Sequence, residues 1–328
     1  MKYFVTGATG FVGSNVARQL VEQGHEVIVS VRTLAKAKEL AELGVTITQG
    51  DVTDKESMRG AMQGADGVFH IAGWYKIGVR DKSEGSRINI SGTRNVLELM
   101  QELGIKKGVY TSTLAVNSDT HGMLADESYH YSGKHLSEYD RTKWIAHYEV
   151  AEPMIAAGLP LVIVMPGLIY GPGDTSSVRT TFIQYLQRKL PVLPAKTAFS
   201  WARVEDIARG HILAMEQGQV GESYIIAGPT HTLVESMQIA QKITGIPAPR
   251  IKVAPGIMKT MSATMGMVEK VFPVPDNYSA EYLRISAGVT YTGSNARARR
   301  ELGYNPRPLQ EGLRETLQHE MKLLGMAY

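Results

Sequence analysis

The chain has 328 residues, of which 43% are hydrophobic and 20% charged, and its formal net charge is +3. This is the composition of a globular protein, and the charge is too small to indicate a nucleic-acid groove or contact with an anionic membrane. Cysteine is absent, which excludes disulfides, thiolate catalysis and cysteine-bound metals. The longest apolar run, residues 159–165, is far short of the ~20 residues of a membrane span, and no signal peptide is recognisable. We therefore expect a soluble, cytoplasmic protein without a nucleic-acid or membrane partner.

Short β-branched runs alternate with longer amphipathic stretches through the first half of the chain. This alternation is typical of βαβ units, in which parallel strands are covered by helices on both faces. We therefore predict an α/β fold, a doubly wound parallel sheet of the Rossmann type. The expected strands are residues 3–6, 26–31, 45–49, 67–71, 108–112 and 161–166, and the expected helices are residues 12–23, 35–43, 55–62, 90–103 and 138–157.

The character of the sequence changes after Pro166, where prolines and glycines become frequent and methionines cluster in residues 257–271. We expect this part to form a smaller C-terminal substrate lobe, interrupted by a segment that returns to the main sheet. The predicted dinucleotide-binding domain comprises residues 1–168 and 198–228, and the predicted substrate lobe comprises residues 169–197 and 229–328.

A glycine-rich turn, TGATGFVG, follows the first expected strand at residues 6–13. A strand, a glycine-rich turn and a helix together present backbone N–H groups and the positive end of a helix dipole to an anion. Gly7 would permit the tight turn, Gly10 the approach of a pyrophosphate, and Gly13 the packing of the helix on the strand. The spacing by itself is also compatible with a turn that binds no ligand.

The end of the second strand bears on the choice of dinucleotide. A carboxylate there would bind a ribose 2′-hydroxyl and repel a 2′-phosphate, but the sequence has Val31 and Arg32, followed by Lys36 and Lys38. The guanidinium of Arg32 can bind a phosphate through two parallel hydrogen bonds. We predict NADP as the cofactor, with NAD as the alternative and a solvated surface arginine as the simplest other interpretation.

Tyr139 and Lys143 lie four residues apart in an expected helix, so their side chains share one face. An ammonium about 5 Å from the phenol favours the phenolate by about 3 kcal/mol at an effective dielectric constant near 20. That lowers the tyrosine pKa by about 2 units, which suits acid–base catalysis near neutral pH. A hydroxyl at the end of the fifth strand, in the stretch Thr111-Ser112-Thr113, could orient a carbonyl group in front of the tyrosine. The same spacing also occurs on solvated helix faces.

Histidines do not form a recognisable metal site, because their spacing with nearby acids does not match a ligand set. We therefore expect no metal. The histidines considered are His121, His130, His135 and His147.

Together these motifs make the sequence resemble the extended short-chain dehydrogenases/reductases, within the NAD-dependent epimerase/dehydratase family. The resemblance extends over nearly the whole chain and is greatest to the dihydroflavonol-reductase-like branch, which includes hopanoid-associated epimerase-like members. The matching segments are TGATGFVG at 6–13, GDV at 50–52, FHIAG at 69–73, NISGT at 89–93, the Tyr139–Lys143 motif, PGLIYGPGD at 166–174, VEDIA at 204–208 and LGYNP at 302–306.

The resemblance implies roles for individual residues. Thr113, Tyr139 and Lys143 would be catalytic, with Lys143 also holding the nicotinamide ribose. The helices at 90–103 and 138–157 resemble those that form a four-helix interface, which implies a homodimer. The implied cofactor-binding residues are Gly7, Thr9, Gly10, Phe11, Val12, Arg32, Lys36, Asp51, Val52, Ile71, Ala72, Gly73, Tyr139, Lys143, Pro166, Leu168 and Ile169.

Two departures from the family pattern bear on the activity. Val31 and Arg32 replace the acid that favours NAD, and Met165 stands where an arginine often precedes Pro166. We therefore expect an NADP(H)-dependent oxidoreductase that interconverts a ketone or aldehyde with an alcohol. A nucleotide-sugar epimerase or dehydratase that retains NAD, and a non-catalytic regulator that senses NADP, are the alternatives.

Overall fold

In the computed structural model, which describes residues 1–326 except the side chain of Lys36, seven strands form one parallel sheet. Their order is β10-β6-β5-β4-β1-β2-β3, and every neighbouring pair is parallel. The predicted doubly wound fold is therefore confirmed. The strands are β1 (Lys2–Thr6), β2 (Glu26–Val31), β3 (Thr46–Gln49), β4 (Gly67–His70), β5 (Gly108–Thr111), β6 (Leu161–Pro166) and β10 (Ser223–Ile226).

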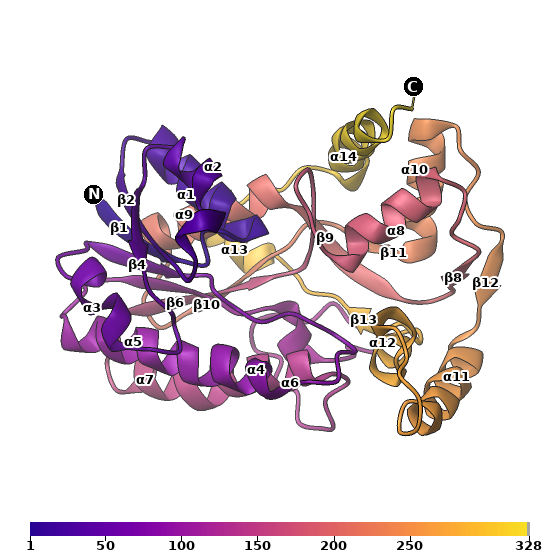
Figure 1. Cartoon of the computed structure of the whole chain (residues 1–328), viewed down its shortest axis with the longest axis horizontal. Helices are drawn as coiled ribbons and strands as arrows, with labels where there is room; N and C mark the ends of the chain where they lie inside the picture. The colour runs from indigo at the N-terminus through magenta and orange to yellow at the C-terminus, as the bar shows by residue number, and fades with distance from the viewer. Residues whose placement is uncertain (327–328) are drawn as a thin grey trace.

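Helices cover both faces of this sheet, because side chains that alternate along each strand are apolar on both sides (Figure 1). Val5 of β1 packs in a core with α1 (Phe11–Glu22) and α9 (Val204–Gln217), and α13 (Ala296–Leu302) joins them. Phe4, one residue earlier, belongs to the core of the opposite face. That face is covered by α3 (Glu56–Met62), α5 (Thr93–Glu102) and the continuous helical segment α6 (Glu138–Trp144), η4 (Ile145–Ala151) and α7 (Glu152–Ala156).

A smaller lobe lies on the other side of the molecule (Figure 1). Its core surrounds Trp201 and Phe182, both buried, where three helices pack on a second sheet. The second sheet has the order β11-β9-β13, with β7 also paired to β9, and β12 pairs with β8. The lobe contains β7 (Leu168–Tyr170), α8 (Ser177–Leu186), β8 (Val192–Pro194), β9 (Ala198–Arg203), β11 (Thr230–Thr232), α10 (Leu233–Thr244), β12 (Ile251–Val253), α11 (Pro255–Val268), α12 (Ala280–Ile285), β13 (Thr290–Tyr291) and α14 (Leu309–Leu323).

The remaining elements are short. They are η1 (Leu34–Lys36), α2 (Lys38–Ala41), α4 (Ser83–Gly85), η2 (Ser86–Gly92), η3 (Leu114–Asn117) and η5 (Asp276–Tyr278).

No helix within residues 1–326 combines the length and the apolar character that crossing a bilayer demands.

The structure corrects the predicted division of the chain at two places. Residues 198–203 form β9 of the small sheet, where Trp201 of this strand packs in the core of the lobe. The part that follows, α9 and β10, packs with the main domain. Residues 296–304, which were assigned to the lobe, pack with α9 through Ala298 and Leu302.

The expected helix at 35–43 is also wrong in extent. It forms one 3₁₀ turn and one α turn, η1 and α2. Among the described side chains of this stretch only Ala37 and Leu40 are buried, and a helix gains most of its stability from a buried face.

Candidate active site

A cavity of about 500 Å³ opens at the C-terminal ends of the main-sheet strands. In a parallel sheet these ends meet at one edge, and ligands of open α/β sheets bind there. The described residues predicted to bind the cofactor all line this cavity, although they come from turns, helices and strands spread between residues 7 and 169. The side chain of Lys36, which was also predicted, lies outside the described part of the chain. Contacts of these residues with a cofactor stay predictions.

The turn after β1 is built so that only glycine fits at two positions. Gly7 has φ +76°, and a Cβ there would lie 2.6 Å from the backbone nitrogen of Ala72. A Cβ on Gly13 would lie 2.2 Å from the carbonyl oxygen of Gly7, so the start of α1 packs directly on the turn. Gly10 precedes α1 and has no side chain, which leaves the first N–H groups of the helix free to face the cavity. This cradle fits the diphosphate of a dinucleotide.

Two side chains lie where the adenosine half of a dinucleotide would be expected. Arg32 is exposed, follows β2 directly and lines the cavity, as does Asp51 after β3. The carboxylate of Asp51 is oriented by its own turn, since Oδ1 accepts hydrogen bonds from the backbone nitrogen and the hydroxyl of Thr53, both at 2.9 Å. The guanidinium of Arg32 is thus available to an anionic group beside the second strand.

Thr113 and Tyr139 are brought together from opposite sides of the site. Thr113 caps η3 after β5, where its hydroxyl accepts a hydrogen bond of 3.2 Å from the backbone nitrogen of Ala115. Tyr139 lies in the first turn of α6, which Ser137 caps by accepting a 3.0 Å hydrogen bond from the backbone nitrogen of Asp140. Both Thr113 and Tyr139 line the 500 Å³ cavity and a second one that adjoins it.

Lys143 projects from α6 toward the end of β5 and is 4% exposed. Its ammonium donates hydrogen bonds to the phenol oxygen of Tyr110, at 3.0 Å, and to the carbonyl oxygen of Thr111, at 2.7 Å. The sequence indicated that Lys143 faces the site but not that a buried tyrosine holds it. Tyr110 occupies an alternating position on an apolar strand, where it resembles any core aromatic residue.

The protonation of the site differs from the expectation. Burial raises the pKa of Tyr139 to about 12, the charge of Asp140 acts in the same direction, and the hydroxyl of Thr113 opposes them. Burial also lowers the pKa of Lys143 to about 7, so near neutral pH much of this lysine is uncharged. The predicted lowering of the tyrosine pKa by the lysine is therefore wrong, because burial removes the phenol from water and leaves much of Lys143 itself uncharged. Tyr139 is protonated at neutral pH, which is the state that a proton donor requires.

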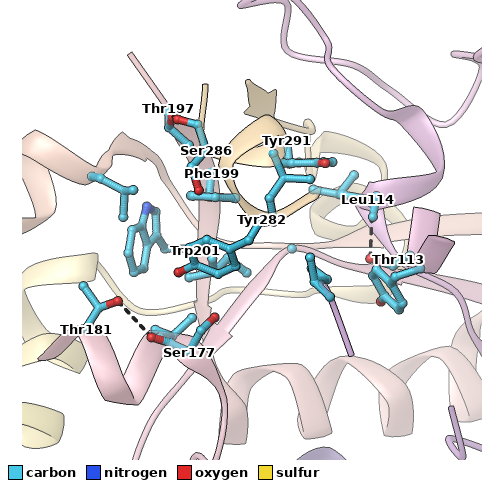
Figure 2. A pocket seen from close by; sticks show the side chains of 18 of the residues that line it. Thr113, Leu114, Ser177, Thr181, Thr197, Phe199, Trp201, Tyr282, Ser286 and Tyr291 are labelled. Atoms are coloured by element: carbon cyan, nitrogen blue, oxygen red, sulfur yellow. Dashed lines mark hydrogen bonds between the residues drawn. The ribbon is translucent and has the colours of Figure 1, made fainter. Parts of the chain in front are cut away.

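The adjoining cavity, of about 260 Å³, is walled mainly by the smaller lobe (Figure 2). Phe199 and Trp201 of β9 and Tyr282 of α12 face it, and Thr113 lies at the side next to the first cavity. Asp140 is the one charged side chain among its described lining residues, and burial raises the pKa of that carboxyl to about 7. The cavity is therefore apolar and close to neutral.

Several of these residues were missed in the sequence. Asp140 lies inside the Tyr139–Lys143 motif, and the alternation of Phe199 and Trp201 on β9 is a signal that could have indicated a shared face.

Within residues 1–326, the histidines and acids do not gather into a group of three that could hold a metal ion.

Comparisons with known proteins agree with this geometry. The sequence model of the NAD dependent epimerase/dehydratase family matches residues 3–227. The chain is 35% identical over 256 residues to a putative dihydroflavonol 4-reductase of Synechocystis sp., covering 76% of this chain and 74% of that protein. It is 30% identical over 334 residues to a 2-alkyl-3-oxoalkanoate reductase of Stenotrophomonas maltophilia, covering 96% and 98%.

Solved structures are similar over almost the full length. The crystal structure of gox2253 superposes with a TM-score of 0.86 at 29% identity, covering 99% of both chains. A UDP-glucose 4-epimerase of Thermotoga maritima has a TM-score of 0.78 at 22% identity, covering 99% of this chain and 100% of that one, which shows the shared fold. The chain therefore belongs to the NAD dependent epimerase/dehydratase family, within the extended short-chain dehydrogenases/reductases, which are NAD(P)-dependent oxidoreductases.

Proposed function

We propose that this protein is an NADP(H)-dependent oxidoreductase that interconverts a ketone or aldehyde with an alcohol, on a neutral and largely apolar substrate. The observation that carries the proposal is the second cavity, which has aromatic walls and meets Tyr139 and Thr113 at one side. A substrate body bound against Phe199 and Trp201 would place its carbonyl group near the two hydroxyls.

The residues of the site would have the following roles in the reaction. The nicotinamide of the bound cofactor supplies or receives the hydride. Thr113 donates a hydrogen bond to the carbonyl oxygen and orients it. Tyr139, protonated because of its raised pKa, gives its proton to that oxygen as the alcohol forms. Lys143 holds the ribose, and in the reverse direction its charged form helps Tyr139 to accept the proton.

The walls of the second cavity favour this reaction over nucleotide-sugar chemistry. A nucleoside diphosphate carries two negative charges, which proteins usually bind with arginine or lysine. None of the described residues that line the cavity is a lysine or an arginine, and position 165, where an arginine often stands in this family, is a buried methionine. The epimerase alternative therefore lacks the cations that its substrates would require in this cavity.

The names of several relatives support an apolar substrate. Similar proteins include the 2-alkyl-3-oxoalkanoate reductase and a 3 beta-hydroxysteroid dehydrogenase/Delta 5-->4-isomerase of Mycobacterium tuberculosis, which is 28% identical over 345 residues. Both names describe oxidation or reduction at an oxygen-bearing carbon, in an alkyl-substituted oxo acid in one case and in a steroid in the other. The choice of NADP rests on Arg32 and on the apolar Val31 beside it.

A spectrophotometric assay tests the proposal. Purified protein with NADPH is mixed with acetophenone, with ethyl benzoylacetate or with UDP-glucose, and the nicotinamide absorbance is followed. We expect NADPH to be consumed with at least one of the two neutral ketones, and chromatography of the nucleotides to show that UDP-glucose is unchanged. Conversion of UDP-glucose to another sugar nucleotide, with the ketones unchanged, would contradict the proposal.

A further inference from the structure

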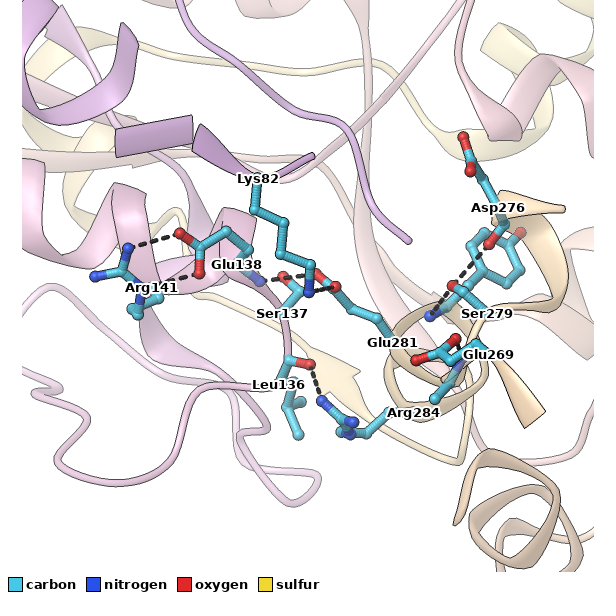
Figure 3. A network of polar contacts seen from close by, with 12 residues as sticks. Lys82, Leu136, Ser137, Glu138, Arg141, Glu269, Asp276, Ser279, Glu281 and Arg284 are labelled. Atoms are coloured by element: carbon cyan, nitrogen blue, oxygen red, sulfur yellow. Dashed lines mark hydrogen bonds and ion pairs between the residues drawn. The ribbon is translucent and has the colours of Figure 1, made fainter. Parts of the chain in front are cut away.

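The first turn of α6, which carries Tyr139, is held by side chains from a distant part of the chain (Figure 3). The carboxylate of Glu281, on α12, accepts a 2.7 Å hydrogen bond from the backbone nitrogen of Glu138, the first residue of α6. Arg284 donates a 2.9 Å hydrogen bond to the carbonyl oxygen of Leu136. These contacts join segments almost 150 residues apart in sequence, at the end of the helix where the backbone N–H groups have no partner within the helix.

A third contact reaches the same turn from β13. The phenol of Tyr291 donates a 3.0 Å hydrogen bond to Oδ2 of Asp140, and the hydroxyl of Ser137 donates a 2.6 Å hydrogen bond to Oδ1. Asp140 follows Tyr139 directly, and its side chain is 1% exposed. The residue next to the proton donor is therefore fixed by a group from the lobe, not only by its own helix.

The segment that holds the turn is also a wall of the substrate cavity. Tyr282 and Ile285 of α12 line that cavity, and they are the sequence neighbours of Glu281 and Arg284. Tyr291 lines it as well, and its ring stacks on Phe199 with a centroid distance of 5.9 Å and an interplanar angle of 4°. A substrate that contacts this wall therefore contacts residues joined to the turn that carries Tyr139.

The carboxylate of Glu281 is buried and contacts protein groups. It is 5% exposed, and its second carboxylate oxygen pairs with the ammonium of Lys82, whose side chain is 44% exposed. A buried carboxylate is costly unless it is paired and hydrogen-bonded. Here one oxygen is paired with Lys82 and the other with the helix N-terminus, where negative charge is favoured by the helix dipole.

We propose that Glu281 and Tyr291 are positioning residues that hold the first turn of α6, and with it Tyr139, against the substrate wall. The effect on turnover rests on the proposed function, because it requires Tyr139 to be the proton donor. The contacts themselves do not depend on it. Since proton transfer is sensitive to small displacements of the donor, loss of this hold should slow the chemical step more than it weakens cofactor binding.

Four variants separate positioning from general stability. Glu281→Leu removes the acceptor for the nitrogen of Glu138, whereas Glu281→Gln keeps an oxygen that can accept that hydrogen bond. Lys82→Met removes only the half-exposed ion-pair partner and leaves the acceptor in place. Tyr291→Phe keeps the aromatic wall and removes only the hydroxyl that binds Asp140, so it tests the proposal even if Glu281→Leu does not fold.

Two measurements are made on each variant. The first is a kinetic and binding measurement. It gives kcat with NADPH and the ketone that the wild-type protein reduces, and the Kd for NADPH from fluorescence titration. We expect kcat to fall about tenfold or more in Glu281→Leu and Tyr291→Phe, with the Kd for NADPH changed less than about twofold. Glu281→Gln and Lys82→Met should retain most of the wild-type kcat.

The second measurement is hydrogen exchange of the backbone amides in residues 136–141, which needs no substrate. Exchange there should accelerate in Glu281→Leu and not in Glu281→Gln. The proposal is overturned if Glu281→Leu does not accelerate this exchange and does not lower kcat more than Lys82→Met does. If no ketone is reduced by the wild-type protein, the proposed function fails on its own, and the exchange result still decides whether Glu281 holds the turn.

Discussion

Lys143 and Tyr110 are joined by a 3.0 Å hydrogen bond inside the protein, with the ammonium also 4.6 Å from the centre of the tyrosine ring. Tyr110 in turn stacks on His70, at 5.5 Å between ring centres, and no part of the Tyr110 side chain reaches solvent. His70 contacts the hydroxyl of Thr6 at 2.9 Å, and Thr6 accepts hydrogen bonds from the backbone beside the glycine-rich turn. Lys143 and the glycine-rich turn are therefore linked through a series of buried side chains, Tyr110, His70 and Thr6.

Replacing Tyr110 by phenylalanine should change how the protein responds to pH. The phenol oxygen accepts a hydrogen bond from the charged form of Lys143, so its loss should lower the lysine pKa below its present value of about 7. Because the charged lysine is the form that would hold the ribose, NADPH affinity should start to fall at a lower pH than in the wild-type protein. Fluorescence titration of NADPH across pH 5.5 to 9 measures this, at roughly half-unit steps.

Tyr185→Phe is the matched control for that experiment. Tyr185 is also buried, and its hydroxyl donates a 2.6 Å hydrogen bond to the carbonyl oxygen of Ile246, in the core of the lobe. The Tyr185→Phe variant should lose some stability and keep the wild-type pH dependence of NADPH binding. Identical binding profiles for wild type and Tyr110→Phe would mean that Tyr110 does not tune Lys143.

Tyr139→Phe should abolish most turnover while leaving the fold and NADPH binding nearly intact. The phenylalanine keeps the ring that lines both cavities and lacks only the hydroxyl that would donate the proton. The loss should be about 10²–10⁴-fold in kcat, the range for a missing general acid. Steady-state kinetics and NADPH titration on the same preparation check it. Turnover close to that of the wild-type protein would remove Tyr139 from the mechanism.

Arg32→Ala should weaken NADPH binding by about tenfold or more and change NADH binding little. A hydrogen bond to a charged group contributes about 1.5–3 kcal/mol, and about 1.4 kcal/mol corresponds to a factor of ten. Val31→Asp should act further in the same direction, since a carboxylate there would repel a 2′-phosphate. Titrating both cofactors against each variant measures the preference. Equal losses of affinity for NADPH and NADH, or a wild-type protein that prefers NADH, would show that Arg32 does not bind the 2′-phosphate.

The buried carboxyl of Asp140 should make stability depend on pH. Burial raises its pKa from the ordinary value of 3.8 to about 7, so the native state binds a proton that the unfolded state has released between these values. Its contribution to stability is therefore full below about pH 4 and is lost as the pH rises through about 7. The slope in this window is about 1.4 kcal/mol per pH unit for one proton.

Asp140→Asn removes that slope. Urea unfolding at several pH values between about 4 and 8 should show the free energy of unfolding of the variant falling less steeply than that of the wild-type protein. Ser137, Tyr291 and Glu281 surround this carboxyl, and none of them is changed by the substitution. Parallel curves for the two proteins would show that Asp140 does not titrate in this range.

The sequence by itself determined the main sheet, the glycine-rich turn and the residue types of the candidate site. These features depend on short-range patterns: apolar strands alternating with helices, Gly7 at a left-handed backbone position, and Tyr139 one helical turn from Lys143. Backbone geometry fixes what such patterns can form, so the strands and the shared helix face of Tyr139 and Lys143 could be predicted without knowing how distant segments pack.

Tertiary structure decided the properties that come from distant segments meeting. The pKa of Tyr139 rises and that of Lys143 falls because the whole fold removes both groups from water, which a pairwise estimate from their spacing could not include. The apolar substrate wall combines β9 and α12, about 80 residues apart, and Glu281 reaches a helix that begins at Glu138. β9 belongs to the small sheet because Trp201 and Phe199 pack in the core of the lobe, with partners that are distant in sequence.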